Sequence, residues 1–472
     1  MLEKIQQALL LLMLLLLCAR LNAEVVQYRV DVEPDLRTVS VQARFAQPVE
    51  YLNARAARAG DLGEIWDCEQ QAGAGVAKTL SVRGVQRLRL SRPLRCLAYR
   101  ARLRPLDRGG FQGSGAIMST PRQWLWLPRL SQNDRVVLTL NLPAKMQASV
   151  PWARRAGRYE FGPSPESGDG LALFGRFPVA QLSIPGGQLP VALASAQSSN
   201  SDWQTWQRWL QAAVNDVSAV GGRFPNPDAQ ILLVPSKDYR GQSPVPFGHV
   251  VRDMGEAVRF FVEPGRALAD YLNDWTASHE FAHLLLPYVQ DKWVSEGFAS
   301  YYQNLLMARR GAYSQEELWQ RLNRSFNRAA AIAEPPTLAR LADDEFWRVR
   351  MLVYWSGAAV ALLADTQLRE SSGGVESLDT VLARLQRCCL PASKSLSGEA
   401  FFALLDSHSP QPLFVGLYDA FAHAPGMPTV ADLFKRLGVL SQGDQVRLLD
   451  SAPLALVRQQ IGTQSVVAEQ TN

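Results

Sequence analysis

The hydrophobic pattern of this chain changes near residue 195, and that change constrains the fold more than any other feature. Before it, apolar and polar residues alternate in runs such as 25–32 and 38–45, as in strands with one buried face. After it, apolar residues recur at helical spacing, beginning with 203–220. A chain of 472 residues is also too long for one ordinary domain. We therefore expect an α+β, multidomain protein in which a β-sandwich-like domain precedes a mainly helical one.

Further strands are expected in both regions, at 88–90, 98–103, 136–142, 231–234 and 258–262. The small, polar stretch 192–201 is typical of a domain boundary. We therefore assign 24–195 to the N-terminal β-domain and 200–440 to the second domain. Residues 441–472 are expected to form a C-terminal extension.

The first residues resemble a secretory signal peptide. Lys4 precedes the apolar run 8–19, and small residues end at Ala23, a plausible cleavage point. The run is shorter than the roughly 20 residues that span a bilayer. Residues 1–23 are therefore predicted to be a signal, and the mature protein to be periplasmic or secreted. An uncleaved anchor, which would tie the protein to a membrane, remains the alternative.

The composition argues against nucleic-acid binding, and the cysteines suit an oxidising compartment. The formal charge is +5 with no dense basic tract, so nucleic-acid binding is not expected. The chain has five cysteines, four of them after the signal. We predict that Cys68 and Cys96 are bridged, with two buried thiols as the alternative. Cys388 and Cys389 are adjacent and are not expected to bridge, because such a bond is strained. With no histidine near these cysteines in the sequence, a Cys/His zinc site is not expected either.

A short motif inside the predicted helix 268–286 carries the first chemical signal. His279 and His283 are four residues apart, so both imidazoles lie on one helical face and can reach a single ion. Glu280 lies close to that face, where it can take a proton from water at the metal. An amphipathic helix with two packed histidines is the alternative.

A third ligand is expected on the next helix. Catalytic zinc needs three protein ligands and an open position for water. Glu296 lies near the start of a helix that begins at about Trp293 and ends near Gly311, and the short connection 287–291 would bring it beside His283. The sequence therefore predicts one Zn²⁺ ion. A solvated first-turn glutamate favoured by the helix dipole is the alternative.

Three segments together resemble the gluzincin metallopeptidases, the group that includes thermolysin and the large aminopeptidases. They are HEFAH at 279–283, WVSEGFASYY at 293–302 and YWSGAAVALLADTQLR at 354–369. More narrowly, about residues 270–440 resemble the glycyl-aminopeptidase family of metallopeptidases. That family joins an N-terminal β-domain to a thermolysin-like catalytic domain, and the resemblance implies the same fold here.

The resemblance also implies roles for individual residues. His279, His283 and Glu296 would hold zinc, and Glu280 would be the general base and acid. Tyr354 would match the tyrosine that stabilises the transition state in related aminopeptidases. Judged without the resemblance, Tyr354 is a tyrosine in an apolar helix, which is more often part of a core.

The chain departs from the family pattern at three places. Twelve residues lie between His283 and Glu296, fewer than is usual in the large aminopeptidases. The glycine-rich exopeptidase signature is absent, and 253–256 occupies a comparable place, where Glu256 would either receive a substrate's amino terminus or face solvent. About thirty residues follow Gly438, too few for the PDZ module with which family members often end.

These observations predict an exported zinc metallopeptidase that acts on a peptide or protein substrate, with an aminopeptidase favoured. An endopeptidase on the same scaffold stays open, as does a non-catalytic, metal-containing binding or assembly factor. Glu280 argues against the last, because a structural site needs no base. Of the remaining histidines, His249 is the best candidate to support the site, whereas His408 and His423 are expected to be surface or core residues. The oligomeric state is not indicated.

Overall fold

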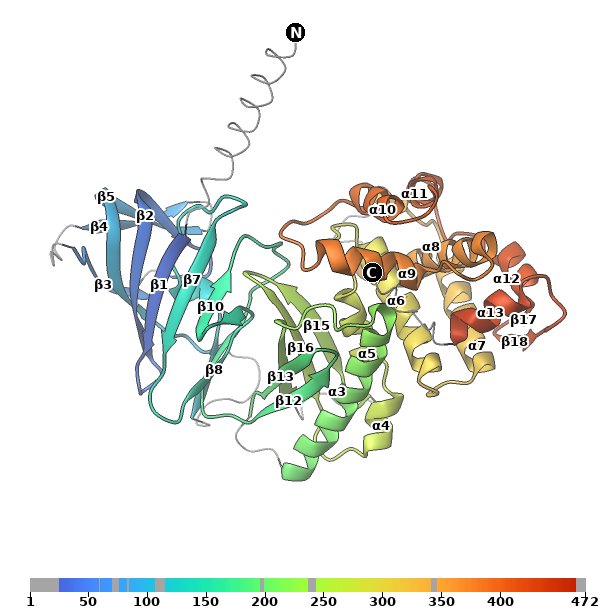
Figure 1. Cartoon of the computed structure of the whole chain (residues 1–472), viewed down its shortest axis with the longest axis horizontal. Helices are drawn as coiled ribbons and strands as arrows, with labels where there is room; N and C mark the ends of the chain where they lie inside the picture. Colours follow the sequence, from blue (N-terminus) through green and yellow to red (C-terminus); the bar gives the residue numbers. More distant parts are fainter. Residues whose placement is uncertain are drawn as a thin grey trace, which may run out of the picture.

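The computed structural model describes residues 25–463, except 59, 70–75, 83–84, 107–114, 196–198, 237–242 and 341–345. Figure 1 shows a β-rich N-terminal part, a central sheet and a helical C-terminal part arranged side by side. The expected α+β, multidomain architecture is therefore present. The predicted signal at 1–23 lies outside the described residues.

The N-terminal part consists of two sheets. Its strands are β1 (Val25–Val32), β2 (Thr38–Ala54), β3 (Leu62–Trp66), β4 (Ala77–Val82), β5 (Val85–Arg102), β6 (Ala116–Ser119), β7 (Arg135–Asn141), β8 (Gln147–Ser149), β9 (Ala153–Arg155), β10 (Arg158–Phe161) and β11 (Ala172–Gly175), with the short helix α2 (Pro121–Trp124) after β6. Eight strands form one sheet in the order β3-β5-β2-β1-β7-β10-β9, with β4 on β5, and three form the sheet β6-β11-β8.

Alternation along the strands explains why these residues form sheets. Every second residue of β1 is buried, and β1 pairs antiparallel with β2 and parallel with β7. Apolar side chains from both sheets, such as Val30 and Phe174, enter one shared core. The segments 88–90 and 98–103, expected as two strands, belong almost entirely to the single long strand β5.

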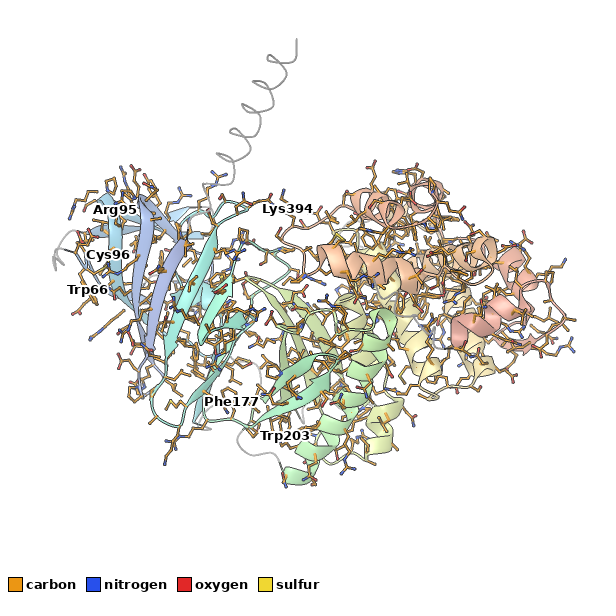
Figure 2. The ribbon with its side chains drawn as sticks, viewed as in Figure 1. Trp66, Arg95, Cys96, Phe177, Trp203 and Lys394 are labelled. Carbon is orange, nitrogen blue, oxygen red and sulfur yellow. A yellow bond between two sulfur atoms is a disulfide. The ribbon has the colours of Figure 1, made fainter. Side chains whose placement is uncertain are left out.

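Cysteine sulfurs meet in two places. Cys96 on β5, labelled in Figure 2, is within bonding distance of Cys68, the pair expected from the sequence. Cys388 and Cys389 also lie within bonding distance of each other, with their Cα atoms 3.7 Å apart. The expectation that neighbouring cysteines would stay apart is therefore wrong for this structure. The helix that carries both cysteines ends at Cys389, and the next residue, Leu390, is already extended.

A five-stranded sheet in the centre supports the site. Its strands are β12 (Val179–Ile184), β13 (Gly187–Leu193), β14 (Gln230–Pro235), β15 (Phe247–Arg252) and β16 (Glu256–Val262). The order is β12-β13-β14-β16-β15, so β15 is an edge strand. β12 and β13 fall inside 24–195, yet β13 pairs with β14 of the second region. Hydrogen bonding between strands therefore crosses the boundary that local composition suggested.

The helices pack on one face of this sheet and then on one another. They are α3 (Asn200–Gly221), α4 (Leu268–Asn273), α5 (Thr276–His283), α6 (Lys292–Arg309), α7 (Gln315–Ala330), α8 (Phe346–Ser372), α9 (Leu378–Cys389), α10 (Gly398–Ser407), α11 (Phe414–Ala422), α12 (Ala431–Leu437) and α13 (Ala455–Gly462), with the 3-10 turn η1 (Leu338–Arg340). Helix α8 is apolar and long enough to cross a membrane, but most of its apolar stretch is buried inside the protein. It is accordingly a core helix here.

The end of the chain is part of the helical core. β17 (Val439–Gln442) and β18 (Gln445–Leu448) form a hairpin, and α13 follows it. Val457 and Ile461 of α13 join the same hydrophobic cluster as apolar residues of α5, α6 and α8. Arg458 is buried and donates hydrogen bonds to the carbonyl oxygens of Leu437 and Gly438. The part of 441–472 that the structure describes is therefore packed rather than appended.

Candidate metal centre

The HEFAH motif lies on α5, a buried helix of two turns. The sequence predicts one helix over 268–286, but the structure has two, α4 and α5, separated at Asp274 and Trp275. The Asp274 carboxylate explains the break, because it accepts hydrogen bonds from the backbone N–H of Thr276 and from the Ser243 hydroxyl. The break gives α5 its own start and direction, and the helix ends before Pro287, as expected.

The three predicted zinc ligands converge between α5 and α6. Glu296 Oε2 lies 3.3 Å from His279 Nε2 and 3.5 Å from His283 Nε2. All three ligand atoms lie within 4.8 Å of one another. Two imidazole nitrogens and one carboxylate oxygen are a donor set typical of catalytic zinc. The residues present therefore fit the metal that the sequence predicts.

The far side of each imidazole is held by a neighbouring polar side chain. His279 Nδ1 lies 3.1 Å from Gln303 Oε1, and His283 Nδ1 lies 3.3 Å from Ser295 Oγ. These contacts favour presentation of both Nε2 atoms to a common point. Gln303 and Ser295 are not among the site residues that the sequence predicts. Their position in the sequence could have suggested them, because both lie on the same helix, α6, as Glu296.

Electrostatics at the centre favour a bound cation. Burial acts to raise the pKa of Glu296, but His283 and His279 outweigh it and lower the pKa, which keeps the carboxylate ionised. Burial acts to lower the pKa of His279, yet Glu296 and Glu280 raise it overall. The His279 imidazole thus lies in a negative field that stabilises positive charge.

Glu280 lies against the edge strand of the central sheet. Its side chain is buried, and burial raises the pKa of its carboxyl, with His279 and His283 opposing. A Cβ on Gly248 of β15 would lie 2.6 Å from Glu280 Cγ. Gly248 is therefore required for this close approach, a role that an isolated glycine in a strand pattern can signal.

Tyr354 projects from α8 toward the same centre. Its ring stacks on His279, with centroids 5.9 Å apart and planes inclined by 16°. Burial, followed by the charges of Glu296 and Glu280, raises the pKa of its hydroxyl, so it remains a proton donor. The structure therefore brings together all five residues that the sequence and the resemblance assigned to the site.

A packed glycine pair sets the distance between α6 and α8. A Cβ on Gly357 would overlap the carbonyl oxygen of Trp293, and one on Gly297 would overlap the backbone of Gly357. Glu296 lies directly before Gly297, and Tyr354 lies one turn before Gly357. The close helix crossing therefore positions a ligand and the tyrosine together.

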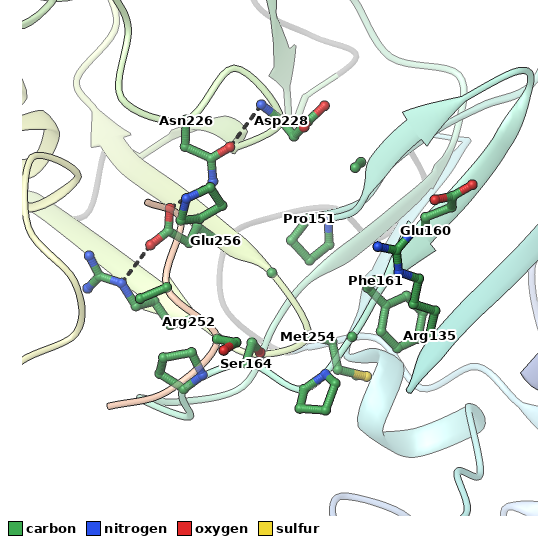
Figure 3. Close-up of a pocket in the computed structure, with 18 of the residues that line it drawn as sticks. Arg135, Pro151, Glu160, Phe161, Ser164, Asn226, Asp228, Arg252, Met254 and Glu256 are labelled. Carbon is green, nitrogen blue, oxygen red and sulfur yellow. Dashed lines mark hydrogen bonds and ion pairs between the residues drawn. The ribbon is translucent and has the colours of Figure 1, made fainter. Parts of the chain in front are cut away.

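A separate cavity of about 610 Å³ lies where the N-terminal part meets β15 and β16 (Figure 3). Glu256, which borders it, forms an ion pair with Arg252 and accepts a hydrogen bond from Asn226. Arg252 also donates hydrogen bonds to the carbonyl oxygens of His283 and Leu286 at the end of α5. Glu256 is thus engaged in a structural network, and none of the five site residues lines this cavity.

Of the remaining histidines, one lies near the predicted ligands and one lies beside a cysteine pair. His249 pairs with Arg259 across β15 and β16, one residue along from Gly248. Burial, followed by the charges of Arg259 and His283, lowers the pKa of His249, and Glu296 opposes this shift. His249 therefore lies within electrostatic reach of two predicted ligands, which agrees with its place as the best supporting candidate. His408 Nε2 is 3.2 Å from Cys388 Sγ and close to Cys389. The expectation that no histidine accompanies these cysteines is therefore wrong, because α10 folds back onto the end of α9.

The protein joins a β-rich N-terminal part to a helical part in which two helices bring together two imidazole nitrogens and one carboxylate oxygen. This arrangement is typical of zinc metallopeptidases. Comparison with known proteins supports this class. Residues 286–334 match the family described as M61 glycyl aminopeptidase, a segment that contains Glu296, Ser295 and Gln303 but neither ligand histidine. No curated protein sequence matches the chain significantly.

Solved structures share the fold at low sequence identity. An aminopeptidase N family protein from Idiomarina loihiensis aligns with a TM-score of 0.61 and 12% identity, over 88% of this chain and 79% of that chain. An M1 zinc metallopeptidase from Deinococcus radiodurans aligns with a TM-score of 0.51 and 15% identity, over 86% and 95%. A two-domain M1 zinc metallopeptidase variant bound to L-arginine aligns with a TM-score of 0.52 and 14% identity, over the same shares. These structures confirm the multidomain α+β fold. The match over 286–334 confirms the predicted resemblance to the glycyl-aminopeptidase family of metallopeptidases.

Proposed function

We propose that the protein is a zinc-dependent peptidase whose active centre is formed by His279, His283 and Glu296. The convergence of the two Nε2 atoms and Glu296 Oε2 carries this proposal. Among the described residues the cluster offers three ligand atoms, whereas structural zinc usually takes four protein ligands. Glu280 beside the cluster supplies the base that a structural site would not need.

The donor set suits zinc, which when bound supplies Lewis acidity that activates water and polarises a carbonyl group. Glu280 accepts a proton from the attacking water and returns it to the leaving amine, and its raised pKa favours that return. The Tyr354 hydroxyl donates a hydrogen bond to the substrate's carbonyl oxygen as that oxygen gains negative charge.

An extended peptide is the substrate that the surroundings favour. β15 is an edge strand, and its Gly248 lies against Glu280, so a peptide added alongside β15 would pass the general base. Aminopeptidase activity is our first proposal, supported by the glycyl-aminopeptidase match. Endopeptidase activity is our second proposal. The sequence suggested that Glu256 could receive a substrate's amino terminus, but its carboxylate already pairs with Arg252 and accepts a hydrogen bond from Asn226.

We also propose that the mature protein is exported after cleavage near Ala23. The apolar run at 8–19 supports this, and so do two cysteine pairs at bonding distance, which suit an oxidising compartment.

The first test replaces Glu280 by Gln. Because the base is lost while all three ligands remain, we expect kcat to fall by about 10³-fold and the zinc content to stay at one ion per chain. Glu296→Gln is the matched variant and should lose zinc as well as activity. Digests of defined peptides then separate the two specificities, since single residues released from amino termini indicate an aminopeptidase and internal cuts an endopeptidase. Full turnover by Glu280→Gln would refute the proposed mechanism.

A further inference from the structure

A second cavity, of about 570 Å³, lies in the N-terminal part against the turn between β15 and β16. It shares Ser164 and Met254 with the cavity of Figure 3, but none of the five residues of the metal centre lines it. Its walls come from β2, β5, α2 and the segments 127–130 and 162–166. Its volume is within the range of small-molecule sites.

The charged side chains that line this cavity are mostly cationic. They are Arg55, Arg87, Arg122, Arg129 and Glu166. We call this space the arginine cavity. Four guanidinium groups facing one carboxylate leave an excess of positive charge around a space that can hold a ligand, and such an arrangement attracts anions.

Two of the four arginines already have acidic partners. Glu166 forms ion pairs with both Arg55 and Arg122, the second at 2.9 Å. Arg122 also pairs with Asp253, which does not line the arginine cavity. The charge of these two arginines is therefore largely compensated within the protein.

Arg87 and Arg129 are not compensated in this way. Within the part of the chain that the structure describes, neither forms an ion pair with a carboxylate. Arg87 is half-buried and held in place, because its Nε donates a 3.2 Å hydrogen bond to Asn53 Oδ1 and its guanidinium carbon lies 5.5 Å from the centre of the Tyr51 ring. Asn53 in turn exchanges backbone hydrogen bonds of 2.8 and 3.0 Å with Leu127, which also lines the cavity. A partly desolvated guanidinium without a counter-charge is unfavourable, and a bound anion would compensate it.

We propose that the arginine cavity binds a small molecule that carries at least two anionic groups, either phosphates or carboxylates. A guanidinium presents a planar set of donors that matches both kinds of group through two parallel hydrogen bonds. Because Glu166 engages Arg55 and Arg122, the anionic groups of the ligand bind chiefly at Arg87 and Arg129. This binding goes beyond the proposed peptidase function and does not depend on it.

Calorimetric titration of the zinc-loaded protein with two probes tests the site. The probes are glutarate, a dicarboxylate, and fructose bisphosphate. We expect at least one of them to bind, and to bind more weakly as the salt concentration rises. Arg87→Gln and Arg129→Gln should each weaken binding by about tenfold, since each removes charge-assisted hydrogen bonds. Arg87→Lys should recover part of the loss, because it keeps the charge without the planar donors.

The control is Arg447→Gln on β18, which removes one exposed positive charge that does not line the arginine cavity. It should leave the affinity unchanged. Arg122 is kept in all variants, because its loss would also remove the partner of Asp253. Thermal denaturation without a probe checks that the variants remain folded, and the bound probe should raise the Tm of the wild type more than that of Arg87→Gln.

The choice of probe identifies the ligand chemistry. Binding of fructose bisphosphate alone indicates a phosphate ligand, and binding of glutarate alone a carboxylate ligand, and either result supports the site if Arg87→Gln weakens it. No binding of either probe to the wild type would overturn the proposal. Equal affinity in the wild type, Arg87→Gln and Arg129→Gln would do so too, since the probe would then be bound elsewhere, for example at the zinc ion. An equal loss in Arg447→Gln would reduce the effect to the net charge of the protein and would also overturn the site.

Discussion

At the scale of single residues, the site depends on how burial and charge set proton affinities. Glu296 and Glu280 are both carboxylates beside the same two imidazoles, yet the pKa of Glu296 is lowered and that of Glu280 is raised. In the proposed mechanism, Glu296 stays ionised as a ligand and Glu280 holds a proton in transit. The HEFAH spacing was enough to predict His279, His283 and Glu280, since the period of a helix fixes their common face.

The residues around Tyr354 do not by themselves predict a role in the reaction. An apolar helix indicates that its side chains are buried, but not toward which part of the protein a given side chain points. Its hydroxyl retains its proton at neutral pH, so we expect Tyr354→Phe to lower kcat by about 10²–10³-fold. KM and zinc content should change little, since the ring that stacks on His279 is retained. Steady-state kinetics and metal analysis measure this. A Tyr354→Phe protein with wild-type kcat would mean that the hydroxyl takes no part in the reaction.

At the scale of elements, two close approaches determine where the site residues lie. Gly248 lets β15 lie against Glu280, and Gly357 lets α8 lie against α6. Buried hydrogen bonds fix the second contact, since the Tyr301 hydroxyl on α6 donates to Asp365 on α8 over 2.8 Å. The sequence predicted α6 and the helix around 353–363, but their crossing depends on tertiary contacts. The split of 268–286 into α4 and α5 likewise depends on Asp274, whose partner Ser243 lies 31 residues away.

Gly357→Ala tests the helix crossing. The added methyl group overlaps the carbonyl oxygen of Trp293, so we expect a loss of about 1–3 kcal/mol in the free energy of unfolding. Activity should fall with it, because Glu296 and Tyr354 move apart. Gly416→Ala in α11 is the control: nothing lies within 4 Å of its added Cβ, and the change should be neutral or stabilising by up to about 1 kcal/mol. Thermal denaturation compares them, and equal stability of the two variants would contradict a tight crossing.

At the scale of the whole molecule, the turn between β15 and β16 joins the N-terminal part to the catalytic part. Met254 in this turn is buried in the N-terminal core. Asp253 is buried, with 1% of its surface exposed. Its carboxylate accepts a hydrogen bond of 2.7 Å from Arg122 Nε and one of 3.0 Å from the backbone N–H of Gly170. Local composition could not reveal this docking, because it depends on residues more than 80 positions apart. The strand that lies against Glu280 is therefore braced by the β-domain.

Asp253→Ala removes the buried partner at this junction. Because it leaves Arg122 and the Gly170 N–H without that acceptor, we expect the protein to lose about 3 kcal/mol in stability. The N-terminal part should also become more accessible to limited proteolysis at its junction. Asp228→Ala removes a more exposed ion pair, with Arg155, between the same two parts, and should cost less than about 1 kcal/mol. Similar unfolding curves and digestion patterns for the two variants would rule out Asp253 as the main brace.

The central claim is that α5 and α6 bind one catalytic zinc ion, and anomalous diffraction at the zinc absorption edge tests it most directly. Crystals of the purified protein should give one strong peak between the two helices, about 2.0–2.2 Å from His279 Nε2, His283 Nε2 and a Glu296 carboxylate oxygen. Zinc found only beside Cys388, Cys389 and His408, or no zinc at α5 and α6 in protein that cleaves peptides, would contradict the account.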